Sequence, residues 1–356
     1  MTFPVLPALC AALLLGCQPA VAQLTVLDQA QDEAGRPAAA PPAAAAATEE
    51  EAAEAAVPAP PCGTAPLSIA RMSWSSAALL SEIHARVLHE AFGCTVSVIP
   101  GDLAATASSM GSTGQPAVAP EMWVTRIADV WNGAIEGQMV RSAAPAYGDT
   151  SFEGWYLPAY MAGANGARPA AAGLAALLAE AAPEGRVRFI SCPIDWACSL
   201  INRNLVAAYG LEGQLEIVEP ANRFEMDSLI GEAVNRREPF VFYYWQPNAI
   251  LAQLDFVALD MGAYDETAAK CLAERACANL QVSAFPPEMV VTALADRVFA
   301  EMPLIAGYFQ RATLDLAVMD GLLARLNEPG ASVESVADGF VAEQAAIWQR
   351  WVGSGP

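Results

Sequence analysis

The sequence predicts an α/β protein, and three observations support this. The chain has 356 residues, enough for two domains of ordinary size. Hydrophobic residues make up 54% of it and charged residues only 16%, so we expect a large buried core and not global disorder. From Cys62 onward, strand-like and helix-like segments alternate, which is typical of α/β units with largely parallel sheets.

The expected elements follow one another along the chain. Ser75 or Ser76 is expected to cap a first helix that stops at Gly93, and Ser332 to cap a final helix. Other helices are expected over 170–181, from Cys198 to Gly210, and over 294–327 with a break near Pro303. Short apolar or β-branched runs predict strands over 67–71, 95–99, 117–122, 155–160, 187–190, 215–218, 240–244 and 289–292.

The N-terminus has the features of an export signal. Residues 3–16 form an apolar segment of signal-peptide length, although no Lys or Arg precedes it. Residues 1–22 are the signal segment, with cleavage either before Cys17, at a sequence resembling a lipobox, or after Ala22. Residues 23–61 form a low-complexity tether rich in Ala, Pro and Glu, and the 44 residues from 18 to 61 would reach roughly 140 Å if extended like polyproline. So long a spacer favours a lipid anchor at Cys17, and either route predicts a periplasmic or extracytoplasmic protein.

Six cysteines remain for pairing after either cleavage, because Cys17 is either lipidated or lost, and an even number in an exported protein favours disulfides. Their spacing suggests the pairs Cys62–Cys94, Cys192–Cys198 and Cys271–Cys277, although six cysteines allow fifteen pairings. No CxxC pair is present, which argues against a zinc ribbon, and we expect no metal.

Charge and histidine content exclude several functions. Eighteen basic against 39 acidic residues give a net charge of −21, which nearly excludes a nucleic-acid binder. The only histidines, His84 and His89, lie five apart on one expected helix and are expected to face solvent, so we predict no catalytic residues and no enzyme. No GxGxxG or Walker-type loop supports a nucleotide cofactor. No apolar run reaches the ~20 residues that a membrane-spanning helix needs.

Tryptophans are the most informative residues. Five of the eight sit at an end of an expected strand: Trp74, Trp123, Trp155, Trp196 and Trp245. Ligands of α/β folds bind beyond the carboxyl ends of strands, and aromatic faces attract cations, quaternary ammonium groups above all. Each ring singly could be ordinary packing, but five at strand ends favour a cation cage.

The segment from Cys192 to Cys198 predicts a second half of such a site. Because a helix is expected to begin here, the amides of Ala197 and Cys198 are free first-turn donors that can hold an anion. A cation cage beside anion-binding amides fits a zwitterion such as a betaine. A turn closed by a disulfide, with Trp196 packed inward, fits the residues equally well.

The order of these motifs resembles the substrate-binding proteins of glycine betaine/proline betaine/choline ABC transporters, over nearly all of 67–351. The resemblance rests on Glu121-Met122-Trp123, on the segment from Gly154 to Tyr160, on Cys192 with Trp196-Ala197-Cys198 running into Leu211, on the segment from Pro239 to Pro247, and on the Cys-x5-Cys loop at Cys271 and Cys277.

The resemblance implies a two-lobed periplasmic-binding-protein fold of type II, with a hinge and a ligand cleft between the lobes. Residues 62–156 and 259–356 would form one lobe, and residues 157–258 the other. Trp123, Trp196 and Trp245 would surround a trimethylammonium group, and the amides of Ala197 and Cys198 would hold a carboxylate. Trp74 and Trp155 would add walls to the cage.

The resemblance also implies partners. These are a small quaternary ammonium ligand (glycine betaine, proline betaine or choline) and an ABC permease with its ATPase, and the chain is expected to be a monomer without a cofactor. Glu121, and Asp195 beside Trp196, each add a carboxylate that would favour a bare cation such as choline. The alternative function is a sensing module of the same fold that reports to a membrane receptor, and an enzyme acting on small amines fits less well.

Overall fold

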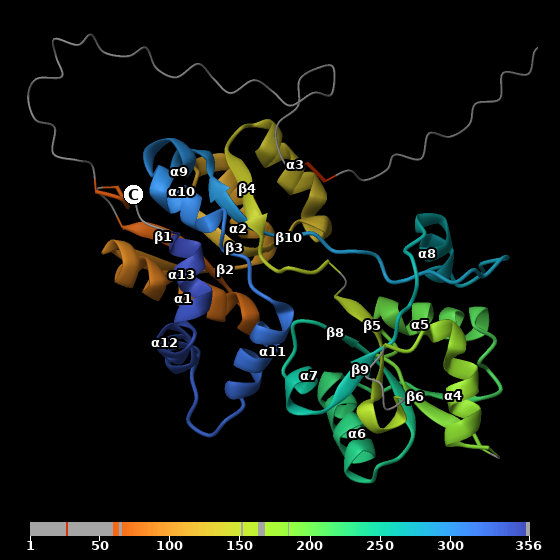
Figure 1. Ribbon diagram of the computed structural model, residues 1–356. Helices are drawn as coiled ribbons and strands as arrows, with labels where there is room; N and C mark the ends of the chain where they lie inside the picture. The colour runs from red at the N-terminus through yellow and green to blue at the C-terminus, as the bar shows by residue number, and fades with distance from the viewer. Residues whose placement is uncertain are drawn as a thin grey trace, which may run out of the picture.

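A computed structural model of the protein describes residues 26–27, 60–63, 66–150, 152–162, 168–183 and 185–353. The chain folds into two lobes, each built on a five-stranded sheet with helices around it (Figure 1). The expected signal segment and nearly all of the expected tether lie outside the described residues.

The first sheet has the strand order β2-β1-β3-β10-β4. β1 runs parallel to β2 and β3, whereas β10 runs antiparallel to both β3 and β4, so the sheet is mixed. The five strands are β1 (Leu67–Met72), β2 (Val96–Gly101), β3 (Val118–Trp123), β4 (Val140–Pro145) and β10 (Val290–Ala295).

The second sheet repeats this plan with the order β7-β6-β8-β5-β9. β6 runs parallel to β7 and β8, and β5 runs antiparallel to β8 and β9. The strands are β5 (Glu153–Pro158), β6 (Val187–Ile190), β7 (Leu215–Val218), β8 (Phe240–Trp245) and β9 (Phe256–Ala258). In each sheet, therefore, an antiparallel strand from a distant part of the chain pairs with the parallel strands: β10 in the first sheet and β5 in the second.

Helices cover the faces of both sheets and seal separate apolar cores. The first lobe holds α1 (Ser75–Phe92), α2 (Leu103–Thr113), α3 (Ala128–Glu136), α9 (Asp296–Glu301), α10 (Pro303–Phe309), α11 (Leu316–Arg325), α12 (Val333–Glu343) and α13 (Ala345–Val352). The second holds α4 (Leu174–Ala181), α5 (Ala197–Ala208), α6 (Arg223–Asn235), α7 (Ile250–Gln253) and α8 (Glu266–Leu272). Across the boundary, α11 lies against α7 (Figure 1).

The chain changes lobe twice, and strand pairing fixes where. The expected boundary after 156 falls inside β5, whose paired residues all belong to the second sheet. The second expected boundary, after 258, precedes α8, which packs on the second lobe through Leu272. The crossings therefore lie between Gly148 and β5 and at 286–289, and they run side by side, with the Glu288 amide donating to the Thr150 carbonyl at 3.1 Å.

Local sequence accounts for most helix ends. Gly93 has a φ of 67°, the left-handed conformation that glycine adopts readily, and it ends α1 as expected. Neither Ser75 nor Ser76 caps α1, because the N-cap position is Trp74. Ser332 does cap α12, in a reciprocal capping box with Ser335. The expected final helix is divided at Gln344 into α12 and α13.

Three disulfides join the cysteine pairs that the spacing suggests. Their Cα–Cα separations are 5.5 Å for Cys62–Cys94, 6.2 Å for Cys192–Cys198 and 5.2 Å for Cys271–Cys277, all within the usual range. The expected pairing is confirmed.

The expectation that both histidines face solvent is wrong for His84, which is 1% exposed, whereas His89 is exposed. His84 lies four residues after Leu80 and four before Leu88, on the apolar face of α1. Its Nδ1 lies 2.7 Å from the Tyr308 hydroxyl, and burial lowers the pKa of its imidazole to about 3.

This buried histidine predicts a pH dependence of stability. Folded His84 stays neutral, whereas the same side chain in the unfolded protein takes up a proton below pH ~6.5. Its contribution to the free energy of unfolding is therefore fully present above that pH and is lost as the pH falls toward 3. In His84→Gln, the fall in unfolding free energy from pH 7 to pH 5 should be smaller than in wild type by about 2 kcal/mol, measured by urea titration. His89→Gln is the matched control and should keep the wild-type slope; equal slopes in wild type and His84→Gln would contradict the assignment.

Val26 and Leu27 form an isolated contact with the first lobe. They pack against the part of its core formed by α2 and α3. The Leu27 amide donates to Asn132 Oδ1 at 2.8 Å, and the Leu27 carbonyl accepts from Trp131 Nε1 at 2.7 Å. A point within the expected tether is thus held on α3. None of the helices within the described ranges combines the length and apolar character needed to span a bilayer.

Candidate functional site

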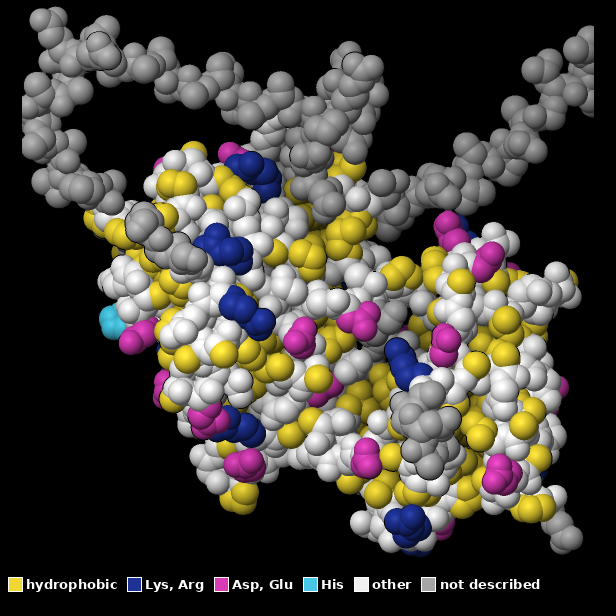
Figure 2. All heavy atoms as spheres, viewed as in Figure 1, with side chains coloured by type: hydrophobic (Ala, Val, Ile, Leu, Met, Phe, Trp, Pro, Cys, Tyr) yellow, Lys and Arg dark blue, Asp and Glu magenta, His cyan; other side chains and the backbone are white. Residues whose placement is uncertain are grey.

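A cavity of about 960 Å³ lies between the lobes, and Figure 2 shows the groove between them with hydrophobic side chains on its walls. Both lobes contribute. Its lining includes Trp74, Ser76, Glu121, Trp123 and Arg126 from the first lobe and Trp245, Gln246 and Asn248 from the second.

The first-lobe wall carries two indole rings. Trp74 is the N-cap residue of α1 and Trp123 is the last residue of β3, so both follow strands of one sheet, and both are half-buried. Their Nε1 atoms donate to the same oxygen, Oε1 of Glu121, at 2.7 Å and 2.9 Å. These two rings are therefore fixed by one shared acceptor.

Glu121 itself is fully buried, at 0% exposure. Besides the two indoles, the Ser76 hydroxyl donates to its Oε1 at 3.0 Å and the Tyr147 hydroxyl to its Oε2 at 2.7 Å. Burial raises the pKa of this carboxyl, and the four hydrogen bonds oppose that rise. The carboxylate that the sequence placed at the ligand thus borders the cavity but is fully buried, with its oxygens occupied by these four donors.

The second-lobe wall is built on Trp245, the last residue of β8. Its ring stacks on Tyr244, with centroids 4.7 Å apart, and meets Trp196 at 5.4 Å. Trp196 is 37% exposed and is the N-cap residue of α5, so the first-turn amides of Ala197 and Cys198 follow it directly. The described residues that line the cavity do not include Trp196, Ala197 or Cys198. These three residues lie next to the cavity, where the Trp196 ring contacts Trp245.

Trp155 lies in a different environment from the other strand-end tryptophans. It is 0% exposed, its Nε1 donates to Asn202 Oδ1 at 2.8 Å, and its ring packs on Phe189 and Tyr209. Its position in β5 turns the ring toward α5 and a smaller cavity of about 550 Å³, away from the indole-lined one. Trp155 therefore belongs to the core of the second lobe.

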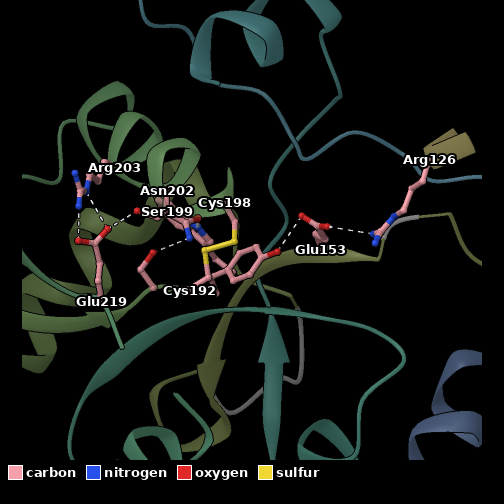
Figure 3. The surroundings of a disulfide bond; sticks show 11 residues. Arg126, Glu153, Cys192, Cys198, Ser199, Asn202, Arg203 and Glu219 are labelled. Carbon is pink, nitrogen blue, oxygen red and sulfur yellow. Dashed lines mark hydrogen bonds and ion pairs between the residues drawn. A yellow bond between two sulfur atoms is a disulfide. The ribbon is translucent and has the colours of Figure 1, made fainter. Parts of the chain in front are cut away.

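The start of α5 is held by polar contacts as well as by the Cys192–Cys198 disulfide. Glu219 accepts from the Ser199 hydroxyl and, at 2.9 Å, from Arg203 Nε. Asn202 Nδ2 donates to the Ser191 hydroxyl at 2.9 Å (Figure 3). These contacts fix the loop that carries Trp196.

Sequence reasoning missed Arg126. Its guanidinium carbon lies 4.6 Å from the centroid of the Trp123 ring, and it pairs with Glu288 at 3.2 Å. The guanidinium also lies 4.0 Å from Glu153 (Figure 3). The available signal was its spacing: three residues after Trp123 in a 3₁₀ turn (Val124–Ile127), where side chains three apart lie on one side.

Sequence reasoning also missed a contact between the lobes at Asp320. This residue of α11 is 3% exposed, and its carboxylate accepts from Gln246 Nε2 and from the Asn248 amide, both at 2.6 Å. Burial raises the pKa of the Asp320 carboxyl. The bonds connect the first lobe to the residues that directly follow Trp245.

Comparison with models of known protein families identifies the family. A family model described as the substrate-binding domain of the ABC-type glycine betaine transport system matches residues 65–343, more than half of the chain. The chain belongs to this family. No curated protein matches its sequence.

Solved structures similar to this family member show the same fold. Apo YehZ from Escherichia coli is 16% identical, with a TM-score of 0.57, over 80% of this chain and 99% of that one. A glycine betaine/carnitine/choline ABC transporter structure is 11% identical, with a TM-score of 0.54, over 79% of this chain and 99% of that one. The expected two-lobed fold of type II is confirmed. Substrate-binding proteins of this glycine betaine transport family are extracytoplasmic and serve transport, not catalysis.

Proposed function

We propose that this protein captures a small quaternary ammonium compound (glycine betaine, proline betaine or choline) outside the cytoplasm and delivers it to an ABC permease with its ATPase. One observation carries the proposal: Trp74, Trp123 and Trp245, from both lobes, line a single cavity. Indole faces are the usual surroundings of a trimethylammonium group, and each ring contributes roughly 0.5–2 kcal/mol.

The expected site residues Trp196, Ala197 and Cys198 lie next to the cavity and would add to the binding of the ligand. Trp196 adjoins Trp245 and would join the cage when the lobes close. A ligand carboxylate has two candidate partners, the first-turn amides of Ala197 and Cys198 and the guanidinium of Arg126. Lipid attachment at Cys17 and a monomeric state are part of the same proposal.

Charge supports capture of a cation. The tether carries seven acids and one base, so about −15 of the net −21 belongs to the lobes. A negative field raises the rate at which cations reach the cleft, without forming the site itself.

Isothermal titration of the purified protein tests the proposal. At least one of glycine betaine, proline betaine and choline should bind with micromolar-range affinity and change tryptophan emission. Ethanolamine is the matched control for choline: it lacks the three methyl groups, is better hydrated, and should bind far more weakly. No heat with any of the three ligands, in a protein that is folded by circular dichroism, would rule the function out.

A further inference from the structure

The carboxylate of Glu121 has an unusual set of partners. Four donors converge on it, and all four are uncharged: two indoles, a serine and a tyrosine. Three of them share Oε1. A buried carboxylate without a cationic partner is costly, so its presence beside the two indoles of the first-lobe wall calls for a physical reason.

Four hydrogen-bond donors favour the ionised form of Glu121, whereas burial raises the pKa of its carboxyl. Indole N–H groups only donate, so Trp74 and Trp123 cannot accept a proton from an acid. Oε1 already accepts three hydrogen bonds, so a proton on this carboxyl would sit on Oε2, beside the Tyr147 hydroxyl. With Glu121 ionised, the arrangement holds a negative charge against the N–H edges of two rings.

A negative charge at that edge changes what the rings do. Hydrogen bonds to an ionised acceptor are stronger than neutral ones and fix both rings in advance of ligand binding. In a low-dielectric interior they also polarise the donor, which increases electron density on the indole faces. Cation–π attraction follows that density, so the faces of Trp74 and Trp123 attract a cation more strongly than unassisted indoles would.

We propose that Glu121 is the specificity-determining residue of the first-lobe wall: its buried charge, transmitted through Trp74 and Trp123, makes the wall select the charge of a ligand as well as its shape. Glu121 is a positioning residue, because it is fully buried and its Oε1 acts through the two indoles bonded to it. The inference rests on the proposed function, since it needs a cation in the cage.

The test compares a cation with an uncharged ligand of the same shape. Choline and 3,3-dimethyl-1-butanol differ by one atom, since carbon replaces the charged nitrogen. Glu121→Gln removes the charge and keeps the shape: its carbonyl can accept the same three hydrogen bonds, and its amide can donate to the Tyr147 hydroxyl. By calorimetry on the full exported chain, this variant should lose about tenfold or more in choline affinity, while affinity for the neutral alcohol changes by less than about threefold.

Tyr147→Phe is the matched control. It removes the hydrogen bond to Oε2 but leaves the charge and both indole bonds, so the preference for choline over the alcohol should persist. Equal losses for both ligands in Glu121→Gln would reduce Glu121 to a structural role and overturn the proposal. Unchanged choline affinity in that variant would overturn it as well.

The Trp74→Phe variant and the ligand preference of the wild type provide two further tests. If Glu121→Gln does not fold, Trp74→Phe keeps a ring but removes its N–H donor, and it should also lower choline affinity more than alcohol affinity; an equal loss counts against the proposal. Wild type must itself prefer choline to the alcohol. Failure of the proposed function would look different, because wild type would then bind none of the three quaternary ligands.

Discussion

Trp245→Ala should weaken binding of choline and glycine betaine by at least ~1 kcal/mol, about fivefold in Kd. Trp245 is the second-lobe indole on the cavity, and stacking on Tyr244 and contact with Trp196 hold its face in place. Alanine would remove the cation–π attraction and leave ligand methyl groups against water. The loss should appear mainly as faster dissociation, because hot-spot rings act on the bound state. Calorimetry and stopped-flow tryptophan fluorescence measure both quantities.

Two variants separate cage from packing effects. Trp245→Phe keeps a smaller aromatic face and should lose less affinity than Trp245→Ala. Trp155→Phe alters a buried tryptophan in the same lobe and should leave ligand affinity unchanged, because that ring faces the core. Wild-type affinity in Trp245→Ala would assign this ring to packing alone.

Asp320→Asn should lower the free energy of unfolding by about 1–3 kcal/mol and weaken ligand binding. An asparagine offers one oxygen where the carboxylate offers two, so it can accept from Gln246 or from Asn248 but meets the other donor with its own N–H groups. Loss of a buried charge offsets part of this cost. Binding should suffer because the residues after Trp245 lose their connection to the first lobe.

Urea unfolding and calorimetry measure the two effects on Asp320→Asn. Asp338→Asn is the control: this exposed carboxylate pairs with Arg86 at the surface, where an ion pair contributes at most ~1 kcal/mol. If Asp320→Asn keeps the stability and ligand affinity of the wild type, the hydrogen bonds from Gln246 and Asn248 to Asp320 do not stabilise the fold or position Trp245.

Sequence alone predicted the elements whose signal is local. β6 and β7 have the expected bounds, since each is a short apolar run between turns, and Ser332 marks the start of α12. β4 was missed because its sequence, VRSAAP, is short of large apolar residues. The antiparallel places of β5 and β10 depend on pairing with strands far away in the sequence, which no local pattern encodes.

The same distinction holds for the site. A tryptophan at a strand end is visible in the sequence, but the side of the sheet that its ring faces is not, and this separates Trp155 from Trp123 and Trp245. Asp320 and Gln246 are 74 residues apart and belong to different lobes, so only the fold brings them together.

The two hydrogen bonds between Leu27 and α3 shorten the distance by which a membrane anchor could be separated from the lobes. Residues 28–59 join two points on the same lobe, since Leu27 is bonded to α3 and Pro60 precedes the disulfide at Cys62. In a chain lipidated at Cys17, as proposed, Val26 would be nine residues from the anchor, about 30 Å when extended. The α3 side of the first lobe would then stay within that distance of the bilayer for as long as Leu27 is bonded to α3.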